Sequence, residues 1–157
     1  MVTHEQPITD KYSTFTRPVS STEDTVYIAG MGQRRITITR WADGAVAYAF
    51  TVPTTHGVAW VQVHEDHLGI FGVEVQSARH ANLFYRVSLT DRPRCECPHY
   101  HYAHTCTHLK AVAPAAIQLV MAYQRALRNR AITARITAAH ERIHAEYGVW
   151  CEEEAQA

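Results

Sequence analysis

The sequence has 157 residues, no net charge and 46% hydrophobic residues. This length predicts about one domain, and the hydrophobic content is enough for one core, which argues against a disordered chain. No apolar run approaches the ~20 residues of a membrane-spanning helix, and the polar N-terminus lacks the apolar stretch of a signal peptide. We therefore expect a soluble, intracellular protein with no membrane partner, cytoplasmic in a prokaryote or nuclear in a eukaryote.

The charges are unevenly distributed along the chain. Between Arg79 and Arg142 there are ten Lys or Arg residues and three acids, and the remainder of the chain is correspondingly acidic. A basic stretch of this kind indicates a polyanionic partner, although a solvated helix face would have the same composition.

The first half of the chain has the pattern of antiparallel strands. Residues 1–22 contain prolines and a Ser/Thr run, and we expect them to be a flexible tail. Residues 23–90 are predicted to form an antiparallel β-region, because residues 35–40 alternate polar and β-branched side chains before an Asp43-Gly44 turn. Further strands are predicted at 46–52, 58–63, 70–75 and 83–89. The polar residues 64–67, His-Glu-Asp-His, are expected to form a solvated loop.

The second half is rich in helix-forming residues. One apolar stripe runs through Leu109, Ala113, Ala116, Val120, Tyr123 and Leu127, and a second runs through Ile132, Ile136, Ala139 and Ile143. Pro114 is expected to break the first helix near Ala113 or to begin a second helix. We therefore predict a helical region over residues 114–148, followed by an acidic tail at 149–157, and an α+β fold.

Three of the four cysteines lie close together in the sequence RCECPHYHYAHTCTHLK. Cys95 and Cys97 are two residues apart, so on an extended chain their side chains project to the same face. Cys106 and His108 follow after eight residues, where the helix is expected to begin. Three thiolates and one imidazole form a tetrahedral donor set that suits one structural Zn²⁺ ion. Because four protein donors leave no open position, the site is predicted to be structural rather than catalytic.

Three other histidines are alternative ligands. His99, His101 and His104 lie between Cys97 and Cys106, and any of them could replace His108 in a flexible loop. We favour His108 because the start of the helix fixes its position.

These residues resemble the SWIM-type zinc finger. The resemblance covers about residues 83–113: a strand at 85–89, then Cys95-Glu96-Cys97-Pro98, then Cys106-Thr107-His108 and an aliphatic helix start. The family often has Lys at the position of Thr107. The resemblance implies that an antiparallel β-meander leads into a ββα SWIM-like zinc finger, with C-terminal helices after it.

The resemblance also implies a binding role. SWIM-type fingers occur in transposases, chromatin remodellers, transcription factors and recombination accessory proteins, and some act in protein interactions. We therefore expect a non-catalytic protein that binds nucleic acid, DNA more than RNA, or that assists a DNA transaction such as transcription, recombination or transposition. The candidate phosphate contacts are Arg92, Arg94, Lys110, Arg125 and Arg128. The alternative is a protein–protein interaction adaptor whose apolar helices bind a partner.

A second motif, His140-Glu141-Arg142-Ile143-His144, matches the H-E-x-x-H pattern of zinc metalloproteases. Arg142 places a cation beside the proposed metal, and few residues remain after His144 to supply a third ligand. The protease is therefore a remote alternative.

Overall fold

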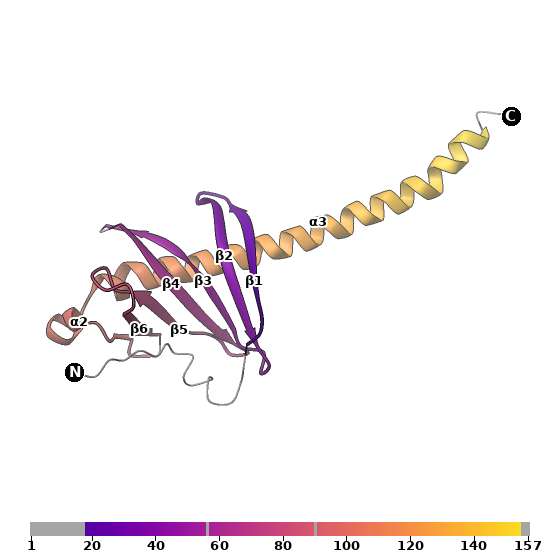
Figure 1. Cartoon of the computed structure of the whole chain (residues 1–157). Helices are drawn as coiled ribbons and strands as arrows, with labels where there is room; N and C mark the ends of the chain where they lie inside the picture. The colour runs from indigo at the N-terminus through magenta and orange to yellow at the C-terminus, as the bar shows by residue number, and fades with distance from the viewer. Residues whose placement is uncertain (1–17, 56, 90, 155–157) are drawn as a thin grey trace. The chain divides into compact units, whose positions relative to one another are not determined.

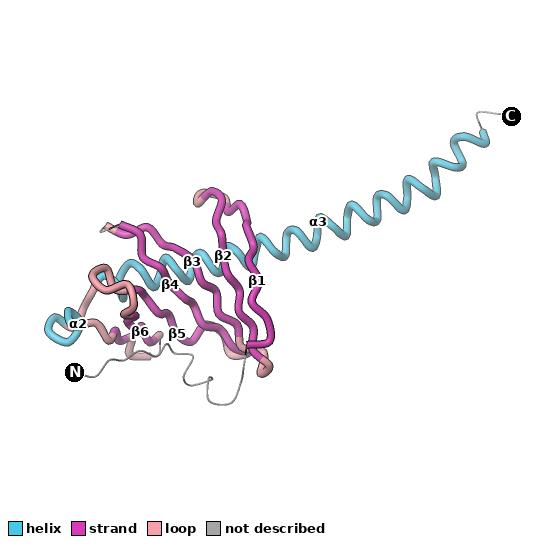
Figure 2. The backbone as a smooth tube through the Cα atoms, viewed as in Figure 1, coloured by secondary structure: helices cyan, strands magenta, loops and turns pink. Residues whose placement is uncertain are grey.

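The computed structural model describes residues 18–55, 57–89 and 91–154 of the chain, with side chains as far as Tyr147. The predicted α+β class is confirmed, because a seven-stranded antiparallel sheet is followed by a long helix (Figure 1). The helices and strands in Figure 2 are, in chain order, β1 (Pro18–Ile28), β2 (Gly32–Trp41), β3 (Val46–Thr54), β4 (Gly57–Asp66), β5 (Gly69–Gln76), β6 (Phe84–Ser88), β7 (Arg94–Cys95), α2 (Pro98–Ala103), η1 (His108–Val112) and α3 (Ala113–Glu154).

The sheet is a meander in which every strand pairs with the strand before it, in the order β1 to β7. The predicted Asp-Gly turn joins β2 to β3. Gly44 has a φ of 88°, a left-handed conformation that glycine adopts without strain, and Ala45 N–H donates to the Asp43 carboxylate at 3.0 Å. This local chemistry fixes the register in which Ile38 lies opposite Tyr48.

Most of the core lies on one face of the sheet. A row of cross-strand neighbours passes from Ile38 through Tyr48, Val63, Val73 and Val87 to Cys95, and every member is buried. β-branched side chains suit this position because they fill the space above a pleated strand. The row ends at a cysteine, so the packed face of the sheet leads directly to the predicted metal ligands.

The chain divides into two compact units, residues 1–122 and 123–157. In the first unit η1 contacts β3 and β7. Ala113, Ala116 and Val120 on the predicted helical stripe are buried, and so is Val112 of η1. The second unit contains the remainder of α3, whose side chains are exposed from Arg128 to Tyr147. Within the described residues, no helix combines the length and the apolar character required to cross a bilayer.

The predicted tail at 1–22 is wrong for its last five residues, since β1 begins at Pro18. Residues 1–17 lie outside the described part of the chain. β1 is an edge strand, and most of its side chains are exposed, so it needs few apolar residues. For this reason the polar sequence of residues 18–22 did not indicate a strand.

The expectation that Pro114 begins a second helix is close to the structure, but the prediction of a further, separate C-terminal helix is wrong. Pro114 is the second residue of α3, in the first turn, where a helix does not use the backbone N–H that proline lacks. α3 continues without interruption through residues 149–154, where the sequence predicts an acidic tail. Residues 155–157 of that tail lie outside the described part of the chain.

The expected solvated loop at 64–67 is partly a buried strand. His64 belongs to β4 and is 3% exposed, with its Nε2 atom 3.3 Å from a carboxylate oxygen of Glu74 on β5. The two side chains form a hydrogen bond across the strand pair, and this bond permits both polar groups to be buried.

Candidate metal centre

Two ligands come from the end of the sheet. Cys95 is the last residue of β7 and lies opposite Val87 of β6, so its side chain joins the core face. Cys97 caps the N-terminus of α2, where Pro98 is the first helical residue. Both thiols are 2% exposed. The two sulfurs also lie within 4.8 Å of one another, so both residues can contribute to one site, as the C-x-C spacing predicts.

The chain reverses direction through the short helix α2 rather than through a flexible loop between Cys97 and Cys106. α2 ends at Ala103. Its C-cap residue, His104, adopts the left-handed conformation with a φ of 53° and donates its N–H to the Tyr100 carbonyl at 2.8 Å. The Tyr100 hydroxyl donates to the Pro93 carbonyl at 3.2 Å, which ties the helix to the strand before it. This closure returns the chain to the first two cysteines.

The donor atoms of Cys95, Cys97, Cys106 and His108 all lie within 4.8 Å of one another. Sγ of Cys95 is 3.7 Å from Nδ1 of His108. Donors held at about 2.0–2.3 Å around a tetrahedral ion are about 3.6–3.8 Å apart, so this separation fits a shared ion. The four side chains could therefore hold one metal ion, and Nδ1 is the nitrogen of His108 that would bind it.

Neighbouring groups hold the second pair of ligands in place. Leu109 N–H donates to Sγ of Cys106 at 3.4 Å, a bond that favours the thiolate. The ring of Tyr85 on β6 lies 5.2 Å, centre to centre, from the ring of His108. His108 opens the π-helical turn η1, and such turns are frequent at functional sites. The ligand ring is thus positioned by both the sheet and the helix start.

Burial sets the protonation of these ligands before a metal binds. It raises the pKa of the Cys95 thiol and also that of Cys106, in each case as the largest cause. It lowers the pKa of His108, which keeps the imidazole neutral and able to bind an ion. A metal must therefore displace protons from the sulfurs but not from the ring.

The alternative histidines do not join this cluster. His99, His101 and His104 are exposed, and the only group of three or more metal-binding side chains among the described residues is the one that contains His108. The two histidines of the H-E-x-x-H motif also lie outside the cluster. His140 and His144 lie on exposed α3 with ring centres 6.4 Å apart, and the described residues supply no third ligand to them.

The predicted phosphate contacts fall into two groups. Arg92, Arg94 and Lys110 are exposed in the first unit, where Arg94 and Lys110 are close in sequence to the cysteine and histidine ligands. Arg125 and Arg128 are exposed in the second unit. The structure therefore brings only the first three to the same compact unit as the metal centre.

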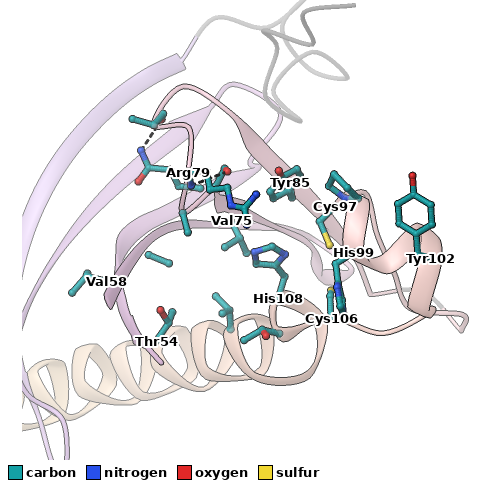
Figure 3. A pocket seen from close by; sticks show the side chains of 18 residues that line it. Thr54, Val58, Val75, Arg79, Tyr85, Cys97, His99, Tyr102, Cys106 and His108 are labelled. Carbon is teal, nitrogen blue, oxygen red and sulfur yellow. Dashed lines mark hydrogen bonds between the residues drawn. The ribbon is translucent and has the colours of Figure 1, made fainter. Parts of the chain in front are cut away.

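A concave surface beside the centre was not predicted from the sequence. The cavity, of about 860 Å³, is lined by Cys97, Cys106 and His108 together with side chains from the sheet, from the loop between β5 and β6 and from α2, among them Arg79 of the loop and Tyr102 of α2 (Figure 3). The Ser77 hydroxyl accepts the N–H groups of Arg79 and His80 at 3.3 Å, which holds the loop that carries Arg79. Tyr102 is 89% exposed. Only the mixture of tyrosine and histidine in residues 99–104 signalled this surface in the sequence.

Comparison of the chain with protein-family models, curated proteins and solved structures gives no match. The site itself therefore defines the class: a small α+β protein with a Cys₃His cluster that could bind a metal, at the junction of an antiparallel sheet and a helix.

Proposed function

We propose that this protein is a small, non-catalytic zinc-binding protein of the SWIM-finger type that binds nucleic acid, DNA in preference to RNA. The observation that carries the proposal is the convergence of three sulfurs and one imidazole nitrogen within 4.8 Å. Soft thiolates with one imidazole in a tetrahedral set favour Zn²⁺.

The chemistry of this donor set supports a structural ion. Four protein donors complete a tetrahedral shell, so water has no free position at which it could be activated. The three cysteines are buried, so the ion would be covered by protein on the sulfur side. Its binding energy would stabilise the connection between β7, α2 and η1, because these three elements share the ligands.

The surface around the centre supports a polyanionic partner. Arg92, Arg94 and Lys110 are exposed near the ligands in sequence, and Arg79 lies at the adjoining cavity. Tyr102 projects from α2 at the same cavity and offers a ring on which an unpaired base can stack. Proteins that bind single-stranded nucleic acid use cations to contact the phosphates and exposed aromatic rings to stack with the bases.

The direct test combines metal analysis with a binding assay. Purified protein should contain one equivalent of zinc by elemental analysis and should shift random-sequence DNA at low salt, with weaker binding to RNA of the same length. Binding should weaken steeply as salt is raised. Stoichiometric zinc without any shift at micromolar protein would reject the nucleic-acid role and keep the metal site.

A protein–protein adaptor is the second candidate, and one observation favours it. Ile132, Ile136 and Ile143 are exposed on α3, as a helix that binds a partner requires. The stripe has basic neighbours, Arg135 and Arg142, so its surroundings do not exclude an acidic partner. The H-E-x-x-H protease has no such support.

A further inference from the structure

The second unit presents an apolar face that nothing in the described chain covers. Ile132, Ile136 and Ile143 are 54%, 63% and 55% exposed, and with Ala139 they form the second apolar stripe of the sequence. Residues at these spacings lie on one side of a helix. Exposed isoleucines in a row are uncommon on a helix that remains alone in water, because their burial against a partner is favourable.

The charges of this segment differ between its two halves. Residues 123–138 contain four arginines and no acid, whereas residues 139–154 contain five glutamates and one arginine. This order does not stabilise an isolated helix, because the last turn of α3 contains no basic residue and a helix C-terminus favours cations. The charges instead complement those of a second, oppositely directed copy of the same segment.

We propose that this protein self-associates through residues 123–147 of α3, with two copies packed antiparallel along the isoleucine stripe. One register satisfies both the apolar and the charged residues. Ile132 of each copy lies opposite Ile143 of the other, and Ile136 lies opposite Ala139, because these pairs are equidistant from the peptide bond between Thr137 and Ala138.

The same register pairs opposite charges beside the apolar seam. Arg128 and Glu146 are eighteen residues apart, which is about five helical turns, so they share one side of the helix. Their midpoint is Thr137, half a residue from the midpoint of the isoleucine pairs, so in the antiparallel pair Arg128 of one copy lies within about one residue of the level of Glu146 of the other, twice. Arg135 and Arg142 lie on the same side but farther round the helix, where their side chains extend into solvent.

This occupant is favoured over a nucleic acid by charge. A nucleic acid would be attracted by the arginine half and repelled by the glutamate half of the same helix. A parallel second copy would place like charges together along the whole length. Only the antiparallel second copy brings arginines to glutamates in both halves.

The first experiment measures mass. Zinc-loaded full-length protein, free of nucleic acid, is analysed by light scattering after size-exclusion chromatography over a range of micromolar concentrations, and the mass should reach twice 17.7 kDa. Ile136→Asp should give a monomer with an unchanged metal content. Ala134→Asp, which lies on the opposite side of the same exposed helix, should remain a dimer. A monomer at every concentration, or a dimer that survives Ile136→Asp, overturns the proposal.

The second experiment tests the orientation. Arg128→Glu and Glu146→Arg should each weaken the dimer about tenfold, and the double variant should restore it. The two positions are about 27 Å apart along one helix, so rescue cannot come from contacts within a copy. In a parallel dimer each residue meets its own counterpart, and the double variant would not be rescued. Failure of rescue therefore overturns the antiparallel register.

Discussion

Nδ1 of His108 lies 3.7 Å from Sγ of Cys95, although thirteen residues and a complete helix separate the two in the chain. The two residues belong to β7, the last strand of the sheet, and to η1, the first turn of the helical region. This contact connects β7 to η1, so a metal bound there would stabilise both elements.

Removal of any ligand is expected to lower zinc affinity by at least about 100-fold, since even groups that only support a ligand are worth about 10- to 100-fold. Cys97→Ser and His108→Ala are the informative variants, measured by competition with a chromophoric chelator. His99→Ala and His101→Ala are the matched controls, because both side chains are exposed on α2 and outside the cluster. Equal losses in the controls would mean that the ligand set is different.

Chelation of the metal is expected to loosen residues 94–112 more than the sheet. The ligands belong to β7, the N-terminus of α2 and η1, whereas the valine row across β4, β5 and β6 is buried without their help. Hydrogen exchange measured by mass spectrometry, with and without a strong chelator, should show faster exchange in 94–112. Uniform protection in both samples would indicate that no structural ion is present.

Metal affinity is expected to rise with pH, because protons and the ion compete for the same sulfurs. Burial raises the pKa of Cys95 and Cys106, so both thiols are protonated at neutral pH before a metal binds. Binding should release at least these two protons, and affinity should rise by at least about 100-fold per pH unit near neutrality. Zinc titration in weak buffer with an indicator dye measures the protons. No change in affinity between about pH 6 and 8 would contradict the assignment.

Without metal, the protein is expected to be most stable between about pH 6.5 and 8.5. Because the pKa of His108 is lower in the folded state, the unfolded state takes up a proton on this ring first as pH falls. The protein therefore loses stability below the pKa that His108 has in the unfolded state. The raised pKa values of Cys95 and Cys106 act in the other direction, and their contribution is lost as pH rises above the unfolded value. Thermal denaturation of chelated protein across this range measures both limits.

The nucleic-acid proposal makes a prediction about salt. Replacement of both Arg92 and Arg94 by alanine should weaken DNA binding and reduce the dependence of log affinity on log salt by about two, one for each lost phosphate contact. Arg35→Ala is the control, because this arginine is exposed on β2 and outside the basic stretch. An equal effect of Arg35→Ala would show that only general charge matters.

Local patterns predicted a large part of the fold and most of the candidate site. Period-2 alternation at 35–40, the Asp-Gly turn and the C-x-C spacing depend on neighbouring residues, so they could be recognised without coordinates. The burial of His64 could not, because it depends on Glu74 in the adjacent strand. The edge strand β1 lacks a strong apolar pattern, and the cavity beside the centre joins residues from distant loops.

The order of the strands has a consequence for how the chain acquires its structure. Each strand of the sheet pairs with the strand before it, so the sheet can grow by successive hairpins as synthesis proceeds, and the loops to be closed stay short. Cys106 and His108 come after the last strand. Capture of an ion would therefore be a late event, made on a scaffold that has already assembled.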